Sequence, residues 1–289
     1  MLFIGNEILK VGIDSKGAEL KSVYHQVHQL EYMWSADPEF WAKTSPVLFP
    51  IVGTLKDNTF QYKGRSYHLP RHGFARDKVF EITDQKDHSI TFSLESDQET
   101  LTVFPFPFIF SIKYELNKDM LSVTYHVQNK GKEVMLFSIG GHPAFKVPLV
   151  NGTSYEDYQL RFEQAETAGR WLISKEGLIE KESQPLLNDT NILPLSKDLF
   201  KKDALVLKHL RSHWVELASD KTAHGLRFSI EGFPFLGLWA APGADFVCIE
   251  PWCGIADSVD TDQQLQHKEG IMELKPEGQF SISWNVHFY

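Results

Sequence analysis

The sequence predicts an all-β protein of the sandwich or barrel type, and three observations support that prediction. Hydrophobic and polar residues alternate over several short runs, as they do in half-buried strands. Helical periodicity is scarce, and no strand–helix–strand rhythm points to a parallel α/β sheet. Neither an internal repeat nor a low-complexity linker interrupts the 289 residues, so we expect one domain spanning residues 1–289.

The strands follow from this alternation. The clearest pair is 108–117 and 121–128, joined as a hairpin by the turn-forming Asn117-Lys118-Asp119. A slip of one residue would turn each hydrophobic face to water, so the registers are well specified. Further strands are expected at 90–94, 158–162, 226–230 and 280–289.

Helical signals are few. Asp37-Pro38 has the chemistry of a helix N-terminus, with an N-cap followed by proline at the first helical position. It predicts one short helix that ends near Lys43. Short turns are expected at 196–200 and at 261–268.

The composition excludes several classes of function. The formal net charge is −9, and no basic stripe marks a surface for nucleic acid. Residues Met1–Asp14 lack the basic and apolar regions of a signal peptide. No apolar run approaches the ~18 residues of a membrane span. We therefore expect a cytoplasmic protein, monomeric or homodimeric, that binds neither nucleic acid nor a membrane.

Metal binding is not expected either. Cys248 and Cys253 are interpreted as reduced thiols, because a small secreted domain would carry more cysteines. Three histidine pairs have suggestive spacings, but a metal needs further ligands, and these runs read as strand or turn. The pairs are His25 and His28, His68 and His72, and His209 and His213.

Three segments break the alternation and concentrate Gly, Pro and polar residues, as functional loops on a β scaffold do. The first combines 49–58 with 70–77 and places His72 between Arg71 and Arg76. The glycine directly after His72 allows a close backbone approach to a ligand. The alternative, which this segment alone favours, is a turn whose arginines pair with nearby aspartates.

The second segment, Ser138–Phe145, brackets His142 with two glycines and a proline at the end of an apolar run. Histidine suits a general acid or base near neutral pH, although it could equally cap a bulge. In the third segment, Phe246–Asp257, Glu250 follows a nearly continuous apolar run, where a carboxylate is costly unless paired or used. Trp252 could pack on the face of a sugar, or it could belong to the core.

Together, the His-Gly loop at His72, the Gly-His-Pro loop at His142 and the strand-end Glu250 resemble the aldose 1-epimerase (galactose mutarotase) family, most closely its LacX-type branch. The resemblance extends over nearly the whole chain. It implies a β-supersandwich with a sugar site in a cleft on one sheet. It also implies that His142 is the general acid, Glu250 the general base and His72 a substrate-binding histidine, with Asp203 binding a sugar hydroxyl.

Two positions depart from the family pattern. Galactose mutarotases have an arginine near the position of Thr54, so Arg71 or Arg76 would have to supply that contact. The asparagine that usually precedes the acid histidine is Gly141 here. Both departures concern the choice of sugar and leave the acid–base pair intact.

The implied activity is that of an isomerase that interconverts the anomers of an aldose or an aldose phosphate without a cofactor. The substrate is then a small sugar, and Lys56, Arg71 and Arg76 could hold a phosphate. Proximity of the pair should raise the pKa of His142 and lower that of Glu250. The alternatives are a non-catalytic carbohydrate-binding protein on the same fold, and a glycoside hydrolase with Asp203 or Asp257 as its second acid.

Overall fold

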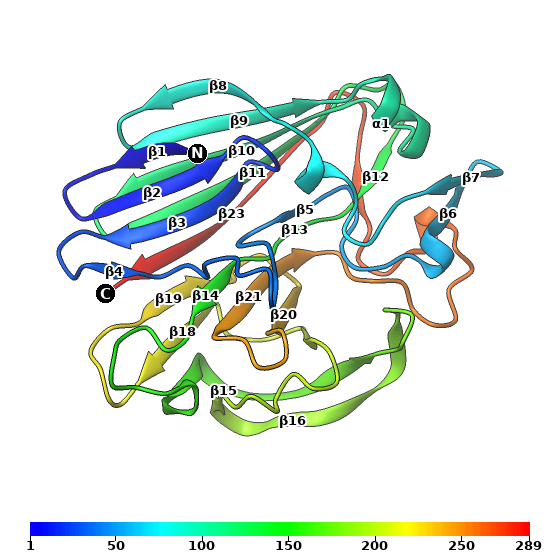
Figure 1. The fold of residues 1–289 in the computed structure, drawn as a ribbon. Coiled ribbons are helices and arrows are strands. Elements are labelled where there is room, and N and C mark those ends of the chain that lie inside the picture. The colour runs from blue at the N-terminus through cyan, green and yellow to red at the C-terminus, as the bar shows by residue number, and fades with distance from the viewer.

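A computed structural model describes all 289 residues, and the chain is built almost entirely of antiparallel strands (Figure 1). The strands form one 15-stranded sheet, one 4-stranded sheet and two 2-stranded sheets. The prediction of an all-β fold is therefore confirmed. No helix is long and apolar enough to cross a membrane.

The 4-stranded sheet covers one end of the large sheet, as Figure 1 shows for the blue strands in front of the cyan and green ones. Tyr114 in the large sheet donates a hydrogen bond from its hydroxyl to the carbonyl of Ala18, 2.6 Å away. The two sheets thus enclose the hydrophobic core as a sandwich. The strands of the small sheet are β1 (Leu2–Gly5), β2 (Leu9–Asp14), β3 (Glu19–His25) and β4 (Leu30–Glu31).

At this end of the large sheet, the predicted alternation is confirmed. Along β10 every second side chain is buried, and the hairpin with β11 pairs Asn117 with Met120 at its turn. The C-terminal strand β23 pairs with β11 and buries Trp284, Val286 and Phe288. The strands are β8 (Glu81–Lys86), β9 (Ser89–Glu95), β10 (Phe108–Asn117), β11 (Met120–Asn129), β23 (Gln279–Phe288), β19 (Leu226–Ser229) and β18 (Trp214–Ser219).

The other end of the large sheet is built around β21 (Phe246–Cys253), whose eight residues are all buried. Two short strands, β13 (Ile139–Gly141) and β14 (Ala144–Lys146), pair with β21 one after the other. The remaining strands here are β5 (Val47–Leu48), β15 (Tyr158–Ile173), β16 (Ile179–Pro194), β17 (Leu205–Lys208) and β20 (Phe235–Trp239). The two small ribbons pair β6 (Thr59–Tyr62) with β7 (Arg65–His68), and β12 (Met135–Phe137) with β22 (Met272–Leu274).

The predicted helix at Asp37–Lys43 is wrong, because only a hydrogen-bonded turn at residues 38–40 forms there. Its first turn forms, since the carbonyl of Asp37 accepts a hydrogen bond from the N–H of Trp41. The N–H groups of Thr44 and Ser45, which would extend a helix, instead donate to the carboxylate of Glu19. The chain therefore leaves the helix after one turn and carries Trp41 toward the large sheet.

The other short elements are helical turns. Residues 196–200 form a turn as predicted, and 261–268 contain η4 (Leu265–His267). Helix α1 (Gln98–Val103) was not predicted, although Asp97 and Thr100 cap it through reciprocal side-chain hydrogen bonds. The remaining turns are η1 (Lys56–Asn58), η2 (Ala75–Asp77) and η3 (Tyr155–Asp157).

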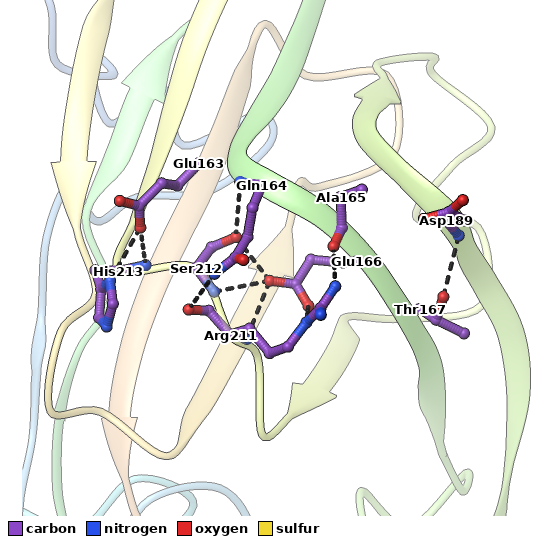
Figure 2. Close-up of polar contacts among 9 residues, drawn as sticks. All are labelled: Glu163, Gln164, Ala165, Glu166, Thr167, Asp189, Arg211, Ser212 and His213. Carbon is purple, nitrogen blue, oxygen red and sulfur yellow. Dashed lines mark hydrogen bonds and ion pairs between the residues drawn. The ribbon is translucent and has the colours of Figure 1, made fainter.

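A buried carboxylate anchors the long β15–β16 hairpin to the rest of the sheet (Figure 2). Glu166 is 2% exposed and accepts hydrogen bonds from the N–H of Arg211, at 3.0 Å, and from the N–H and hydroxyl of Ser212, at 2.7 and 2.6 Å. Glu166 lies where the register between β15 and β16 shifts, so its hydrogen bonds fix the hairpin at an irregular point. The hairpin tip is held separately, by backbone hydrogen bonds of Ile179 with Asp257 and Val259, and it lines the cavity described next.

Candidate active site

All seven site residues predicted from the sequence line a single cavity of about 500 Å³. They are Arg71, His72, Arg76, His142, Asp203, Glu250 and Trp252. The cavity lies beside β21 and is closed on one side by the tip of the β15–β16 hairpin, through Ile173, Gly177 and Ile179. This volume falls within the range of about 300–1,000 Å³ that is usual for small-molecule sites.

Strand pairing brings His142 and Glu250 together. Both β13 and β14 pair with β21, and His142-Pro143 is the interruption between them. The carbonyl of Pro143 accepts from the N–H of Ile249, so the break lies directly opposite Glu250. A glycine and a proline around the histidine allow the strand to stop and resume at this point.

The two side chains are buried and close. The Nε2 atom of His142 lies 3.3 Å from the Oε2 atom of Glu250, and the residues are 8% and 1% exposed. The contact is longer than the ~2.7–2.9 Å of a charge-assisted hydrogen bond, and Oε2 has no aligned donor. Catalytic contacts are often loose in an empty site and tighten with substrate.

The expected direction of both pKa shifts is wrong. Burial lowers the pKa of His142 to about 3, and the charges of Arg71 and Arg76 act in the same direction. Burial likewise raises the pKa of Glu250 well above its ordinary value. Removal of water is the largest cause of both shifts, and it favours the neutral form of each group.

Two tryptophans that sequence reasoning missed complete the surroundings of His142. Trp41 stacks on the imidazole with ring centroids 4.8 Å apart, and Trp239 meets it edge-on at 5.6 Å. Both are half-buried and line the cavity, so they fix the ring and leave aromatic surface for a ligand. Neither lies in one of the three unusual segments, and no local signal singled them out.

His72 is positioned as a hydrogen-bond donor. The N–H of Gly53 donates to its Nδ1 atom over 3.1 Å, which leaves Nε2 to carry the proton of the neutral ring. Burial lowers the pKa of His72 well below its usual value, as do His142 and the two arginines nearby, so the ring is neutral at pH 7. Its backbone has a φ of 69°, and the next residue, Gly73, has no room for a side chain beside the Phe49 carbonyl.

Three charged residues among the seven predicted site residues, Arg71, Arg76 and Asp203, lie on the cavity wall. Arg71 approaches the carboxylate of Asp203 to 3.9 Å, and Arg76 donates to the carbonyl of Arg71 over 2.8 Å. Asp203 has a φ of 72°, and its carboxylate accepts from the N–H of Ala204. Lys56, which was expected near an anion, instead donates to the carbonyl of Val259 and does not line the cavity.

Trp252 is mostly a core residue. It is 5% exposed, and its indole packs so tightly on Gly237 and Gly140 that a Cβ atom at either glycine would lie within 2.7 Å of the ring. Only a small part of the indole reaches the cavity. The more exposed Trp41 and Trp239 are therefore better placed to cover the face of a ligand.

Both departures from the family pattern have a local structural reason. A side chain at Gly141 would collide with the hydroxyl of Tyr125, which is hydrogen-bonded to the indole of Trp284 over 2.9 Å. At Thr54, the hairpin tip fills the adjoining space, because Gly177 packs directly against the threonine hydroxyl. The hairpin thus covers the region where the family resemblance led us to expect an arginine.

A buried ion pair lies next to Ala256, which lines the cavity. The Nζ atom of Lys268 donates to a carboxylate oxygen of Asp257 over 2.8 Å and to the Ile255 carbonyl over 2.6 Å. The second oxygen of Asp257 accepts from the backbone N–H of Lys56 over 2.9 Å. Asp257 is therefore fully engaged in structure and is not available as a second catalytic acid.

One group of possible metal ligands coincides with the acid–base pair. Donor atoms of His142, Cys248 and Glu250 lie within 4.8 Å of one another. Burial raises the pKa of the Cys248 thiol well above its usual value, and a metal binds the thiolate. The same surroundings that suit a neutral proton-transfer pair therefore disfavour this cluster as a metal site.

Comparisons with known proteins show the family of this chain. The sequence model of the family described as Aldose 1-epimerase matches residues 2–267. The chain is 34% identical to the protein LacX of Lactococcus lactis subsp. lactis over 280 residues, which cover 94% of this chain and 93% of that protein. The chain belongs to the aldose 1-epimerase family.

Solved structures of the family share its fold. A galactose mutarotase related enzyme from Lactobacillus acidophilus superposes with a TM-score of 0.95 at 38% identity, over 100% of this chain and 97% of that one. A galactose mutarotase-like protein from Lactobacillus casei superposes with a TM-score of 0.93 at 30% identity, over 100% of both chains. The expected galactose mutarotase-like fold is thereby confirmed for this epimerase-family protein.

Proposed function

We propose that this protein is an aldose 1-epimerase that interconverts the α and β anomers of an aldose or an aldose phosphate. The observation that carries the proposal is the buried contact of 3.3 Å between His142 and Glu250 in a cavity of monosaccharide size. An acid and a base that face one ring are what anomer exchange requires.

The reaction needs two proton transfers at one end of the sugar. Glu250 takes the proton of the C1 hydroxyl while His142 protonates the ring oxygen, and the ring opens to the aldehyde. Rotation about the C1–C2 bond presents the other carbonyl face. The reverse transfers then close the ring as the other anomer, so atoms and charges balance without a cofactor.

Substrate binding would prepare the pair for this chemistry. Before a sugar binds, the pair would keep its proton on Glu250, because burial penalises the charged forms. Hydroxyl groups of a bound sugar donate to the carboxylate and replace part of the missing solvation. The proton then moves across the short contact to His142, which gives the carboxylate base and the imidazolium acid.

The other residues would hold the sugar in place. His72 offers an N–H donor from Nε2, and Asp203 offers an acceptor for a hydroxyl. Trp41 and Trp239 provide aromatic surface beside the acid. A retaining or inverting hydrolase would need a second free carboxyl acid. Asp257 is engaged with Lys268, which leaves Asp203, whose ion pair with Arg71 is long, as the one remaining candidate.

Anomer exchange can be measured by NMR or polarimetry on freshly dissolved single anomers of several aldoses and aldose phosphates. We expect faster equilibration of at least one of them, and a loss of about 10²–10⁴-fold in Glu250→Gln. Glu273→Gln, which changes an exposed carboxylate on β22, serves as the matched control. A folded Glu250→Gln variant with full activity would contradict the assignment of the base.

If tight sugar binding is found without accelerated exchange, the chain is a carbohydrate-binding protein instead. Binding is therefore measured in parallel by calorimetry with the same sugars. Release of a free sugar from a glycoside would indicate hydrolysis, and the same NMR spectra detect it.

A further inference from the structure

The charge of the cavity wall is opposite to that of the whole chain. The chain carries a formal net charge of −9, yet Arg71, Arg76 and Lys201 line the cavity. Only Asp203 and Glu250 oppose them there, and burial favours the neutral form of Glu250. The wall therefore has an excess of positive charge that a neutral sugar would not use.

Arg76 has a buried hydrogen-bond donor that no group of the protein satisfies. Its side chain is 20% exposed, and its Nη2 atom donates to the Arg71 carbonyl. Its buried Nε atom has no hydrogen-bond partner, and the nearest carboxylate, that of Asp77, is 4.0 Å away. A partly buried guanidinium with unfilled donors is costly unless an anion completes it.

Arg71 lies beside Arg76 and is equally available. Its ion pair with Asp203, at 3.9 Å, is long, and its side chain is 47% exposed. The third cation, Lys201, is already paired with Asp198 at 2.7 Å. The two guanidiniums, rather than the lysine, therefore form the unfilled anion-binding group.

We propose that the sugar bound in this cavity carries an anionic group, a phosphate or a carboxylate, which binds to Arg71 and Arg76. This inference rests on the proposed anomer exchange at the same site. With C1 between His142 and Glu250, the anionic group lies at another position of the sugar and makes charge-assisted hydrogen bonds to the guanidiniums. Planar, forked donors match both a phosphate and a carboxylate.

Matched substrates test the inference directly. Anomer exchange is measured by NMR for glucose, glucose 6-phosphate and glucuronate, and for the three galactose counterparts. We expect kcat/KM to be at least 10-fold higher for one anionic sugar than for its neutral parent. Preference for the phosphate or for the uronate identifies the anion. Equal or faster exchange of the neutral sugars overturns this inference but leaves the proposed epimerase, whereas acceleration of none of the six overturns both.

Variants then test the two arginines. Arg76→Gln should lower kcat/KM for the preferred anionic sugar about 10- to 100-fold, the usual loss for a charged hydrogen bond. Its preference for the anionic over the neutral sugar should fall by a similar factor, and Arg76→Lys should recover part of it. Arg65→Gln, at an exposed position of β7, is the control for loss of one positive charge.

Because Arg76 is partly buried, the more exposed Arg71→Gln provides a second measurement if Arg76→Gln does not fold. Inorganic phosphate should inhibit exchange of a neutral sugar by the unmodified protein, and this inhibition should weaken in Arg71→Gln. A ratio of anionic to neutral kcat/KM that is unchanged in both arginine variants would overturn the proposal.

Discussion

The two ends of the large sheet are built in different ways. At one end, β10 and β11 pair in unbroken register over ten residues each, and every second side chain is buried. At the other end, β21 is buried along its whole length, and its partner strand is interrupted at His142-Pro143. The first end packs the core, and the interruption at the second forms the wall of a cavity. The comparison teaches that, in this protein, polar chemistry is concentrated where regular pairing stops.

The largest expected difference between the two ends concerns activity. His142→Gln should slow anomer exchange by about 10²–10⁴-fold, because it removes a proton-transfer group and keeps a side chain of similar size. His126→Gln, on β11 at the other end of the sheet, is the matched control and should exchange anomers at the original rate. NMR exchange rates of both variants decide the point. Equal losses in the two would mean that the effect is structural.

The next largest effect concerns stability, and we expect it at the β10–β11 end of the large sheet. Phe110 on β10 is fully buried and stacks on Phe49 with ring centroids 4.6 Å apart. Phe110→Ala should lower the free energy of unfolding by about 3–5 kcal/mol, because it leaves a cavity in the core. Urea denaturation measures the change. Ile82→Ala, at an exposed position of the edge strand β8, should leave the midpoint nearly unchanged.

The buried ion pair beside the cavity should matter more than those on the surface. Lys268→Met leaves the buried carboxylate of Asp257 without its partner and should destabilise the fold by about 3 kcal/mol. It should also slow anomer exchange, because Asp257 holds the backbone at Lys56 and lies next to Ala256, which lines the cavity. Lys63→Met breaks an exposed ion pair with Glu133 and should change neither the urea midpoint nor the exchange rate noticeably.

The smallest expected effect is a pH dependence of stability, which tests the pKa shifts of His142 and Glu250. Burial lowers the pKa of His142 from 6.5 to about 3, so its contribution to stability is lost as the pH falls from about 6.5. Burial raises the pKa of Glu250 above 4.5, so its contribution is lost as the pH rises from about 4.5. Where both groups are neutral in the folded protein and charged in the unfolded chain, the two states hold the same number of protons, and the two effects cancel.

A variant that lacks one of the two groups should lose this cancellation, and the slope of stability against pH should then have opposite signs in the two variants. Between pH 4.5 and 6.5, stability relative to the unmodified protein should fall with rising pH in His142→Gln and rise in Glu250→Gln. Each slope should approach about 1.4 kcal/mol per pH unit. Urea midpoints at several pH values measure it. Slopes of the same sign in both variants would contradict opposite shifts of the two pKa values.

Much of this comparison was predictable from the residues. Alternation identified the hairpin of β10 and β11 and the terminal strand β23, because strands with one buried face leave a period of two in the sequence. The breaks in that pattern indicated the segments of His72, His142 and Glu250. The helix at Asp37 was overestimated because a distant carboxylate, that of Glu19, captures the N–H groups that would have continued it.

What the sequence determined by itself was the all-β class, the alternation of strands such as β10, β11 and β23, and the three segments that hold His72, His142 and Glu250, since these depend on patterns between near neighbours. Only the tertiary structure decided how those residues behave. It stacked Trp41 on His142, turned Trp252 into the core and left the Nε atom of Arg76 without a hydrogen-bond partner. It also reversed the expected pKa shifts of the pair, because the loss of water around a buried group depends on the whole fold.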